Sequence, residues 1–539
     1  DLHGTEDARI TIKGCDNPDC WYCQKYDSNS FDYAPAEAVA LDRPVFTGAQ
    51  KYDFADTTVS AASDLCMKFT NCSYITLENL EIAGFQDCGV WIYGGTGMEL
   101  KNMKLHNFDN KQNVNAGVMG VLVNDAYDCL FQDLTIWDVG YTRRSEADHG
   151  MYIGHADNCV FENLVIYQSP GAGIQFYAGD NYKIHATNCT IRNSVFVECC
   201  DGLIMCGTEN FNVVNNTFVN SLANDLYLDW NVNSCVFRNN IFYNDYTEGS
   251  YPYQRPTSII GRHNGSGENK VLNNIFDNSI YDYAGPARCQ EGWSAEGFAD
   301  IGDFIAAQQG LNTFSNFNAG EALFIGAIDK DGTTASEQAM SIRNDALFQI
   351  FWASDCVDAG SAEGAPATDI LGNDRTGLPD IGAYEAELAV EYHFTEGDGS
   401  SWTKGSETGL QFKLDGPVGK LVGFLVNGDT VLTDADAELL DDGTTLVLKP
   451  EFLEKLQTGE ISIVALYEDG FAQASFSVVT DTTSSGAASD GGSSSGAASD
   501  GGSSSSGAAS DSGSSSSGTV PATGANGVFA VSAVLFLIA

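Results

Sequence analysis

Basic residues are scarce in this chain of 539 residues. It holds 26 Lys and Arg against 73 Asp and Glu, which gives a formal net charge of −47. This balance argues against a nucleic acid or an anionic membrane as the partner, because both attract cationic proteins. It also disfavours a polyanionic substrate, although a local basic cluster can override the global charge. The abundant Asp and Asn oxygens are compatible with Ca²⁺, but the sequence names no certain cofactor.

The number of cysteines is odd. The sequence has 15, so complete internal pairing is impossible. Cys15, Cys20 and Cys23 lie close together and could bind Zn²⁺ or share a disulfide, and no fourth metal ligand is evident nearby. No initiating Met or signal peptide precedes Asp1, so we read the N-terminus as truncated or processed.

A short repeated pattern occupies the first half of the chain. Its clearest copies are residues 129–136, 159–166, 189–196 and 235–242, each with Cys first and Asn or Asp fifth. Weaker copies begin at positions 75, 98, 212 and 271, so that the period is roughly 22–34 residues. Aligned, the copies give one polar column: Asn79, Asn102, Asp133, Asn163, Asn193, Asn215, Asn239 and Asn273.

Each copy alternates apolar and polar residues, as a strand with one buried face requires. A second short strand follows, often led by Gly, as in residues 89–93, 120–124, 150–154, 173–177 and 202–206. One such unit cannot bury its apolar face alone, whereas stacked units form a continuous core. We expect the Asn column at the bends, bonded from coil to coil, and Cys129, Cys159, Cys189 and Cys235 as a reduced inward column.

These features resemble the right-handed parallel β-helix family, to which pectate-lyase-like enzymes belong. The resemblance covers roughly residues 60–280. It implies an all-β fold of stacked coils whose irregular loops project outward. It implies less about activity, because one fold hosts many functions.

The composition divides the chain into four parts. Residues 1–388 are expected to form the β-helix, with an N-terminal insertion and a C-terminal capping segment. Within them, residues 298–309 have helical spacing, and residues 354–385 resemble the closing segment of bacterial β-helix surface proteins, expected to cover the last coil. Residues 389–480 carry alternating runs and Asn-Gly or Asp-Gly turns at 427, 442 and 469, which predict a small β-sandwich resembling immunoglobulin-like spacer modules.

The last two parts are a tail and a short motif. Residues 481–519 repeat Ser, Gly, Ala and Asp, which predicts a flexible, disordered linker. Residues 520–539 begin with a motif that resembles the Leu-Pro-x-Thr-Gly signal read by sortases: Val520, Pro521, Ala522, Thr523 and Gly524. The resemblance implies cleavage after Thr523, joining to peptidoglycan, and an extracellular, cell-wall-anchored location in a Gram-positive bacterium. The apolar run after it has no terminal Lys or Arg, and we read the C-terminus as truncated.

The Gly-led strands should present a row of side chains to solvent. By alternation the outward residues are Trp91, Tyr93, Asn124, Tyr152, Gln175, Tyr177, Tyr227 and Asp229, and His155 ends its strand nearby. Aromatic rings flanked by amides and carboxylates suit the apolar faces and hydroxyl edges of sugars. We therefore expect a glycan to bind these residues. We also expect the chain to be a monomer.

Ionisable residues stand just before these strands. Asp148 and His149 precede Gly150, while Asp201 and Asp225 precede the strands of adjacent coils. The two carboxyl groups are expected ~5–6 Å apart, a separation that splits their pKa values and suits a glycosidase. Asp201, Asp225, Asp148 and His149 are therefore the predicted catalytic residues.

Three functions remain open at this point. The first is a cell-surface glycoside hydrolase. The second is a lyase or epimerase acting on uronate polymers, since residues 146–150 partly match an epimerase motif and Arg143, Arg144, Lys183 and Arg192 are local cations. The third is an adhesin that binds glycans without turning them over.

Overall fold

A computed structural model describes most of the chain. The described residues are 2–14, 45–47, 63–109, 117–140, 147–177, 183–244, 257–261, 268–277, 312–315, 322–386 apart from 323, 327, 329–332 and 353, and 389–480 apart from 428, 429, 441 and 468. The expected helix 298–309, the linker and the sorting motif lie outside them, as do Cys15, Cys20 and Cys23. The chain divides into two compact units, Asp1–Glu387 and Leu388–Ala539, and each is described by itself.

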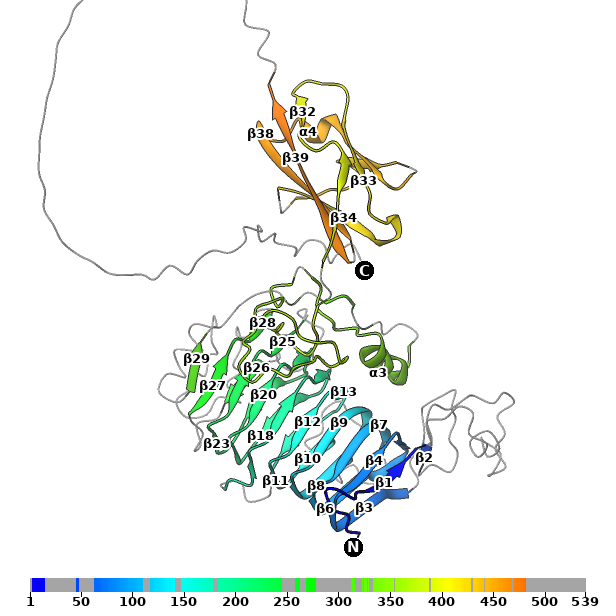
Figure 1. Cartoon of the computed structure of the whole chain (residues 1–539), viewed down its shortest axis with the longest axis vertical. Coiled ribbons are helices and arrows are strands. Elements are labelled where there is room, and N and C mark those ends of the chain that lie inside the picture. The colour runs from blue at the N-terminus through cyan, green and yellow to red at the C-terminus, as the bar shows by residue number, and fades with distance from the viewer. Residues whose placement is uncertain are drawn as a thin grey trace, which may run out of the picture. The chain divides into compact units, whose positions relative to one another are not determined.

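The first unit is a parallel β-helix (Figure 1). Within the described residues, two sheets of parallel strands run along it. The 12-stranded sheet contains eight longer strands: β3 (Ser63–Ser73), β6 (Phe85–Thr96), β8 (Met119–Tyr127), β10 (His149–Ile153), β14 (Ala172–Phe176), β18 (Asp201–Met205), β22 (Asn224–Leu228) and β26 (Thr257–Gly261). Its other members are four two-residue strands that follow β10, β14, β18 and β22 in the chain: β11 (Ala156–Asp157), β15 (Ala186–Thr187), β19 (Thr208–Glu209) and β23 (Val232–Asn233).

The 17-stranded sheet forms the rest of the wall. It consists of β1 (Ile10–Lys13), β2 (Val45–Thr47), β4 (Ile75–Glu78), β5 (Glu81–Ala83), β7 (Glu99–Phe108), β9 (Leu130–Val139), β12 (Val160–Glu162), β13 (Val165–Tyr167), β16 (Thr190–Arg192), β17 (Val195–Val197), β20 (Asn212–Val214), β21 (Thr217–Val219), β24 (Val236–Arg238), β25 (Ile241–Tyr243), β27 (Asn269–Leu272), β28 (Ile275–Asp277) and β29 (Asn312–Ser315). No helix of the described residues is long and apolar enough to cross a membrane.

The strand register places equivalent residues of successive coils side by side. Met151 of β10 lies opposite Ile174 of β14, which lies opposite Leu203 of β18. All three are fully buried, whereas Tyr152, the residue after Met151, is partly exposed. The sequence prediction that the Gly-led strands stack with one buried face is confirmed.

The Asn column turns the chain at one corner of the coils that carry it. Its eight members, from Asn79 to Asn273, all have positive φ angles between 48° and 56°. Asn and Asp tolerate this left-handed conformation better than other non-Gly residues, which explains why they recur there. Some also bond to the next coil as expected: Asn102 Nδ2 donates to Asn79 Oδ1 at 2.7 Å.

A second asparagine ladder lies inside the coils. Asn216 Nδ2 donates to Asn240 Oδ1 at 3.0 Å, and Asn240 Nδ2 donates to Asn274 Oδ1 at 2.9 Å. All three residues are essentially buried. Asn240 Oδ1 also accepts the backbone N–H of Asn216, and Asn274 Oδ1 accepts that of Asn240. The buried backbone donors at this interior turn therefore have hydrogen-bond partners.

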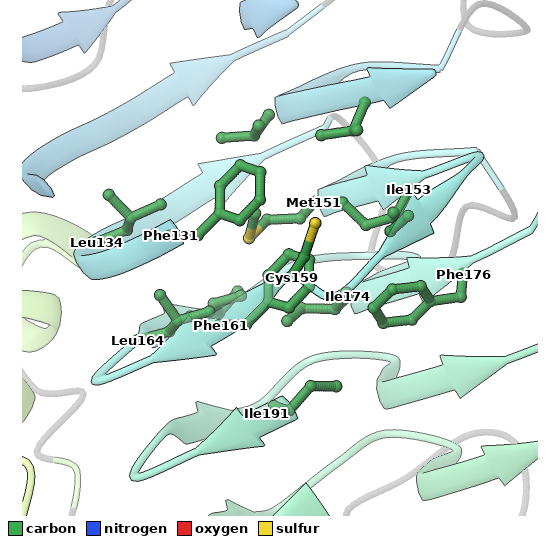
Figure 2. Packing of buried hydrophobic residues seen from close by; sticks show 14 of the residues in the cluster. Phe131, Leu134, Met151, Ile153, Cys159, Phe161, Leu164, Ile174, Phe176 and Ile191 are labelled. Atoms are coloured by element: carbon green, nitrogen blue, oxygen red, sulfur yellow. The ribbon is translucent and has the colours of Figure 1, made fainter. Parts of the chain in front are cut away.

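The remaining interior is apolar and close-packed. Phe131 and Phe161 of neighbouring coils stack with ring centroids 4.7 Å apart, and Figure 2 shows them pointing inward beside Cys159 and Met151. The four cysteines of the predicted column are buried and free. Burial raises the pKa of Cys235 to about 12, which keeps this thiol protonated and unreactive.

The closing segment, residues 354–385, lies beside the coils. Asn193 Nδ2 donates to Thr368 O at 2.7 Å, Asn215 Nδ2 to Asp380 O at 2.8 Å, and Asn239 Nδ2 to Ser361 O at 2.8 Å. With α3 (Ala335–Asn344), the segment buries outward residues of β13, β17, β21 and β25 in a second core. The segment was expected to cover the edge of the last coil, whereas these contacts lie along the sides of several coils. The physical reason is that the outward Val and Ile residues of those strands need an apolar cover.

The second unit is a β-sandwich. One sheet contains β30 (Val390–Tyr392), β32 (Ser400–Thr403), β34 (Leu421–Val426), β35 (Thr430–Val431), β38 (Gly459–Tyr467) and β39 (Gly470–Val479); the other contains β31 (Phe394–Glu396), β33 (Leu410–Leu414), β36 (Ala437–Leu439) and β37 (Thr445–Leu448). A short helix, α4 (Pro450–Leu453), contributes Phe452 and Leu453 to the core between them. The three expected turns join antiparallel neighbours.

A buried carboxyl makes the closing segment sensitive to pH. Asp380 accepts the backbone N–H groups of Asp358 at 2.7 Å and Ala386 at 2.6 Å, and burial raises its pKa to about 6. Its folded-state pKa therefore exceeds the value of about 4 in an unfolded chain. The stabilising effect of its protonation is complete below pH ~4 and is lost as the pH rises through ~6.

We therefore expect Asp380→Asn to flatten part of the pH dependence of stability. From pH 5 to pH 7, the free energy of unfolding of wild type should fall relative to that of the variant by on the order of 1–3 kcal/mol. Urea unfolding of both proteins at several pH values, followed by circular dichroism, measures this difference. Parallel curves for the two proteins would show that Asp380 does not titrate in this range.

Candidate functional site

A row of partly exposed side chains follows the outer face of the 12-stranded sheet. Register places Trp91 beside Leu122, Leu122 beside Tyr152, and Tyr152 beside Gln175, followed by Ile204 and Tyr227. Four of the predicted outward residues thus share one row along the axis. Leu122 and Ile204, which the sequence reading left out, separate them and make the row more apolar.

A second row lies two residues further along each strand. Backbone hydrogen bonds connect its members in order: Tyr177 N donates to Ile153 O, Cys206 N to Phe176 O, and Asp229 N to Met205 O. Asn124, Gly154, Tyr177, Cys206 and Asp229 are therefore equivalent positions of five coils. Tyr177 and Asp229 stand two coils apart, at ~10 Å, so a ligand along the axis could touch both.

Lys68 organises the N-terminal end of the face. Its Nζ lies 3.3 Å from the ring centroid of Trp91 and 5.3 Å from that of Tyr93. Trp91 Nε1 donates to Asn124 Oδ1, and the Trp91 and Tyr93 rings meet edge to face at 6.2 Å. The cation and the amide fix the indole, whose one face is covered by Lys68, while Tyr93 remains 46% exposed.

Tyr152, at the centre of the face, carries a phenol that is partly buried. Burial, together with the neighbouring Tyr177 and Cys206, raises the pKa of Tyr152 to about 12. The phenol therefore keeps its proton at neutral pH and can donate a hydrogen bond to a ligand.

An Asp and two His residues occupy one corner position of three successive coils. Asp125 Oδ1 lies 3.2 Å from His155 Nδ1, and the rings of His155 and His185 are 6.3 Å apart. The side chains of Asp125 and His155 are 43% and 46% exposed, whereas His185 is buried. Sequence reasoning expected His155 to contact substrate but missed Asp125 and His185. A usable signal was present, because each stands four residues before a Cys of the repeat.

The predicted pairing of Asp201 with Asp225 is wrong in register. Asp201 lies opposite Asn224, whose Nδ2 donates to the Asp201 carboxylate. Leu203 lies opposite Leu226, so Asp225 takes the position of Gly202 in the preceding coil and is fully buried. The two Asp residues therefore do not occupy equivalent positions of adjacent coils, as the prediction had assumed.

Asp148 and His149 are also buried, at 8% and 1% exposure. Asp148 Oδ1 accepts the backbone N–H of Val118 at 3.1 Å. His149 Nδ1 accepts the backbone N–H of Ala172 at 3.0 Å, which fixes the tautomer with its proton on Nε2. These contacts give both side chains a structural role at the amino-terminal edge of the sheet.

The Ca²⁺ that the composition allowed would be bound by oxygen ligands held close together. No group of three or more His, Cys, Asp or Glu side chains among the described residues is placed to hold a metal ion. Arg143 and Arg144, two of the cations considered for a lyase, lie outside these residues.

A family model described as "Right handed beta helix region" matches residues 119–288. No curated protein matches the chain. Among solved structures, an alginate lyase from Paenibacillus sp. str. FPU-7 is similar at 15% identity and a TM-score of 0.34, covering 51% of this chain and 82% of that one. The pectate lyase Pel9A is similar at 12% identity and a TM-score of 0.32, covering 64% and 86%.

A third similar structure is the catalytic unit of a GH87 α-1,3-glucanase from Streptomyces thermodiastaticus strain HF3-3. It has 12% identity and a TM-score of 0.23, and the match covers 39% of this chain and 45% of that one. Likenesses this distant say nothing about what the present chain acts on, and the function has to be argued from its own side chains.

The structural role of Asp148 can be tested directly. Asp148→Ala would leave the buried N–H of Val118 without this acceptor, and we expect it to lower the free energy of unfolding by about 1–3 kcal/mol. Asp148→Asn keeps an oxygen acceptor and should cost much less. Chemical denaturation of the three proteins measures both effects. An Asp148→Asn protein that folds normally but loses all turnover of a glycan would instead identify Asp148 as catalytic.

Proposed function

We propose that this protein is a carbohydrate-active enzyme that binds a glycan chain along the outer face of the 12-stranded sheet. The observation that carries the proposal is the row from Trp91 to Tyr227, in which aromatic, amide and apolar side chains share one face. Coils repeat every ~4.8 Å, so the rows form an extended surface suited to a polymer. Exposed aromatic faces bordered by polar groups bind sugar rings by stacking and hydrogen bonding.

Glycoside hydrolysis is the first chemistry to consider. It requires two carboxyl groups ~5–5.5 Å apart in retaining enzymes and ~6.5–9.5 Å apart in inverting ones. Asp201 is engaged by Asn224, and Asp225 is buried, so the pair named from the sequence gives hydrolysis no support. A hydrolase would have to use other carboxylates, for which the exposed Asp125 is one candidate.

Lyase or epimerase chemistry on a uronate polymer is the second candidate. The accessible Asp125–His155 pair favours it, since both reactions need a base that removes a proton next to a carboxylate. Binding without turnover, as in an adhesin, is the third. Incubating the full chain with plant, host and microbial glycans and reading the products by mass separates them: hydrolysis adds water, elimination leaves an unsaturated sugar, and an adhesin gives no product.

A location at the cell wall remains part of the proposal. Its support is the motif from Val520 to Gly524 together with the Ser/Gly-rich stretch before it. Peptidoglycan and a sortase would then be partners in addition to the glycan.

We expect the two ends of the aromatic row to contribute to glycan binding. Trp91→Ala and Tyr227→Ala should each weaken affinity about 3- to 10-fold, since each removes a stacking surface worth ~0.5–1.5 kcal/mol. Isothermal titration with a glycan bound by wild type measures the change. Leu378→Ala, at an exposed position of the closing segment, is the control and should bind normally. Unchanged affinity in both aromatic variants would place the glycan elsewhere.

The sorting motif makes a separate prediction. A sortase supplied with a glycine-based amine should cleave the chain after Thr523 and join the new carboxyl to that amine. Thr523→Ala should abolish the reaction, while a substitution at Ser516, in the preceding linker, should not. Mass spectrometry of the product identifies the junction. Cleavage at another bond, or none, would remove the basis for cell-wall anchoring.

A further inference from the structure

The corner that holds Asp125 and His155 differs from every other His environment in the described first unit. His149 is 1% exposed and its Nδ1 accepts a backbone N–H. His106 is 1% exposed, bonded to Glu81, and stacked on Trp137 with centroids 4.1 Å apart. His155 instead combines a partly exposed ring with a carboxylate on one of its two ring nitrogens, Nδ1.

The carboxylate determines what the other nitrogen, Nε2, can do. Asp125 Oδ1, 3.2 Å from Nδ1, accepts the N–H of the neutral ring and so places the lone pair on Nε2. It also stabilises the imidazolium after proton uptake, as the carboxylate does in other base–orienter pairs. Backbone bonds hold the pair in register, since Ala126 N donates to His155 O at 3.1 Å.

A glycine stands beside the pair on the outward face. The residue before His155 is Gly154, in the second outward row between Asn124 and Tyr177. Its backbone does not require glycine, because its φ is not positive, but an added Cβ would lie close to Val123 O and Asn124 O, both at 3.3 Å, and to Asn124 Cα at 3.5 Å. The second row therefore has no side chain at the position next to His155.

Charge along the same face is suited to a uronate chain. Lys68 lies three coils before His155, ~14 Å away along the axis. A polymer lying along the rows would bring the carboxylate of a neighbouring sugar toward this ammonium. Lys183 stands two residues before His185, adjacent to the same corner, and is exposed. At physiological salt, exposed charges more than ~8 Å apart are largely screened from one another. A cation close to a bound sugar can therefore attract its carboxylate despite the net negative charge of the chain.

Building on the proposed function, we propose that His155 is the general base of a β-elimination on a uronate polymer and that Asp125 is its positioning residue. Nε2 takes the C5 proton of a uronate bound beside Gly154. The electron pair of the broken C5–H bond forms the C4–C5 double bond, and the C4–O bond breaks. The departing glycosidic oxygen takes a proton from water, and His155 later returns its proton to solvent.

The test uses the full chain with polygalacturonate, alginate and hyaluronan as probes. Elimination yields an unsaturated sugar whose ultraviolet absorbance reports the rate. We expect His155→Gln to lower kcat about 10²- to 10⁴-fold with little change in the affinity measured by titration. Asp125→Asn should lower kcat less and alter the dependence of kcat/KM on pH, and Asp125→Glu should restore part of the activity.

The sandwich unit supplies a matched control. His393 Nδ1 lies 3.4 Å from Asp415 Oδ2, and the two side chains are 67% and 43% exposed. Like His155→Gln, His393→Gln removes an exposed imidazole beside a carboxylate. His393 is far in sequence from the residues of the glycan face, so this variant should leave kcat unchanged.

The outcomes separate the inference from the proposed function. Turnover that persists in His155→Gln, or a product that has gained water, overturns the role of His155 and leaves a carbohydrate-active enzyme standing. Binding of the probes without any product overturns the elimination and favours an adhesin. A wild-type chain that neither binds nor cleaves these or any other glycan removes the proposed function, and the inference falls with it.

Discussion

Parallel backbone pairing between one coil and the next is the constraint on which the rest of the first unit depends. It places residues some 20–35 positions apart directly over one another in successive coils, as Asp125 and His155 show. The interior ladders of Phe and Asn, the αL corners and the outward rows all follow from it. None of these arrangements could form within a single coil, because one coil has no second layer against which to bury its apolar face.

Much of this arrangement could be predicted from the sequence, because the repeat records it. The Cys column and the alternation in the Gly-led strands were predicted correctly. The Asn column was located correctly but explained incompletely. Its first requirement is the positive φ at the bend. The same conformation recurs at a second corner, which Asn107, Asp138, Gln168, Glu198 and Asn220 occupy in successive coils.

The candidate site was harder to predict, because a register error of one residue moves a side chain from one face to the other. Asn224 and Asp225 are both polar, and alignment on the strand start favoured Asp225. The structure instead aligns Leu203 with Leu226, which leaves the buried glycine position to Asp225. The Asp125–His155 pair was missed for a different reason. Its two members stand in separate coils, four residues before Cys129 and Cys159, and the sequence reading did not compare these positions from coil to coil.

The path of the closing segment has a mechanical consequence. Arg375 bonds Glu385 at 3.0 Å and reaches Asn193 Oδ1 at 3.1 Å, while Asn215 and Asn239 bond the same segment on neighbouring coils. Tension applied through the residues that follow position 386 would therefore reach several coils together, across their sides. The load would be shared among these bonds, and the terminal coil need not be peeled away first. For a protein tethered at its C-terminal end, this geometry would protect the coils from unwinding under flow.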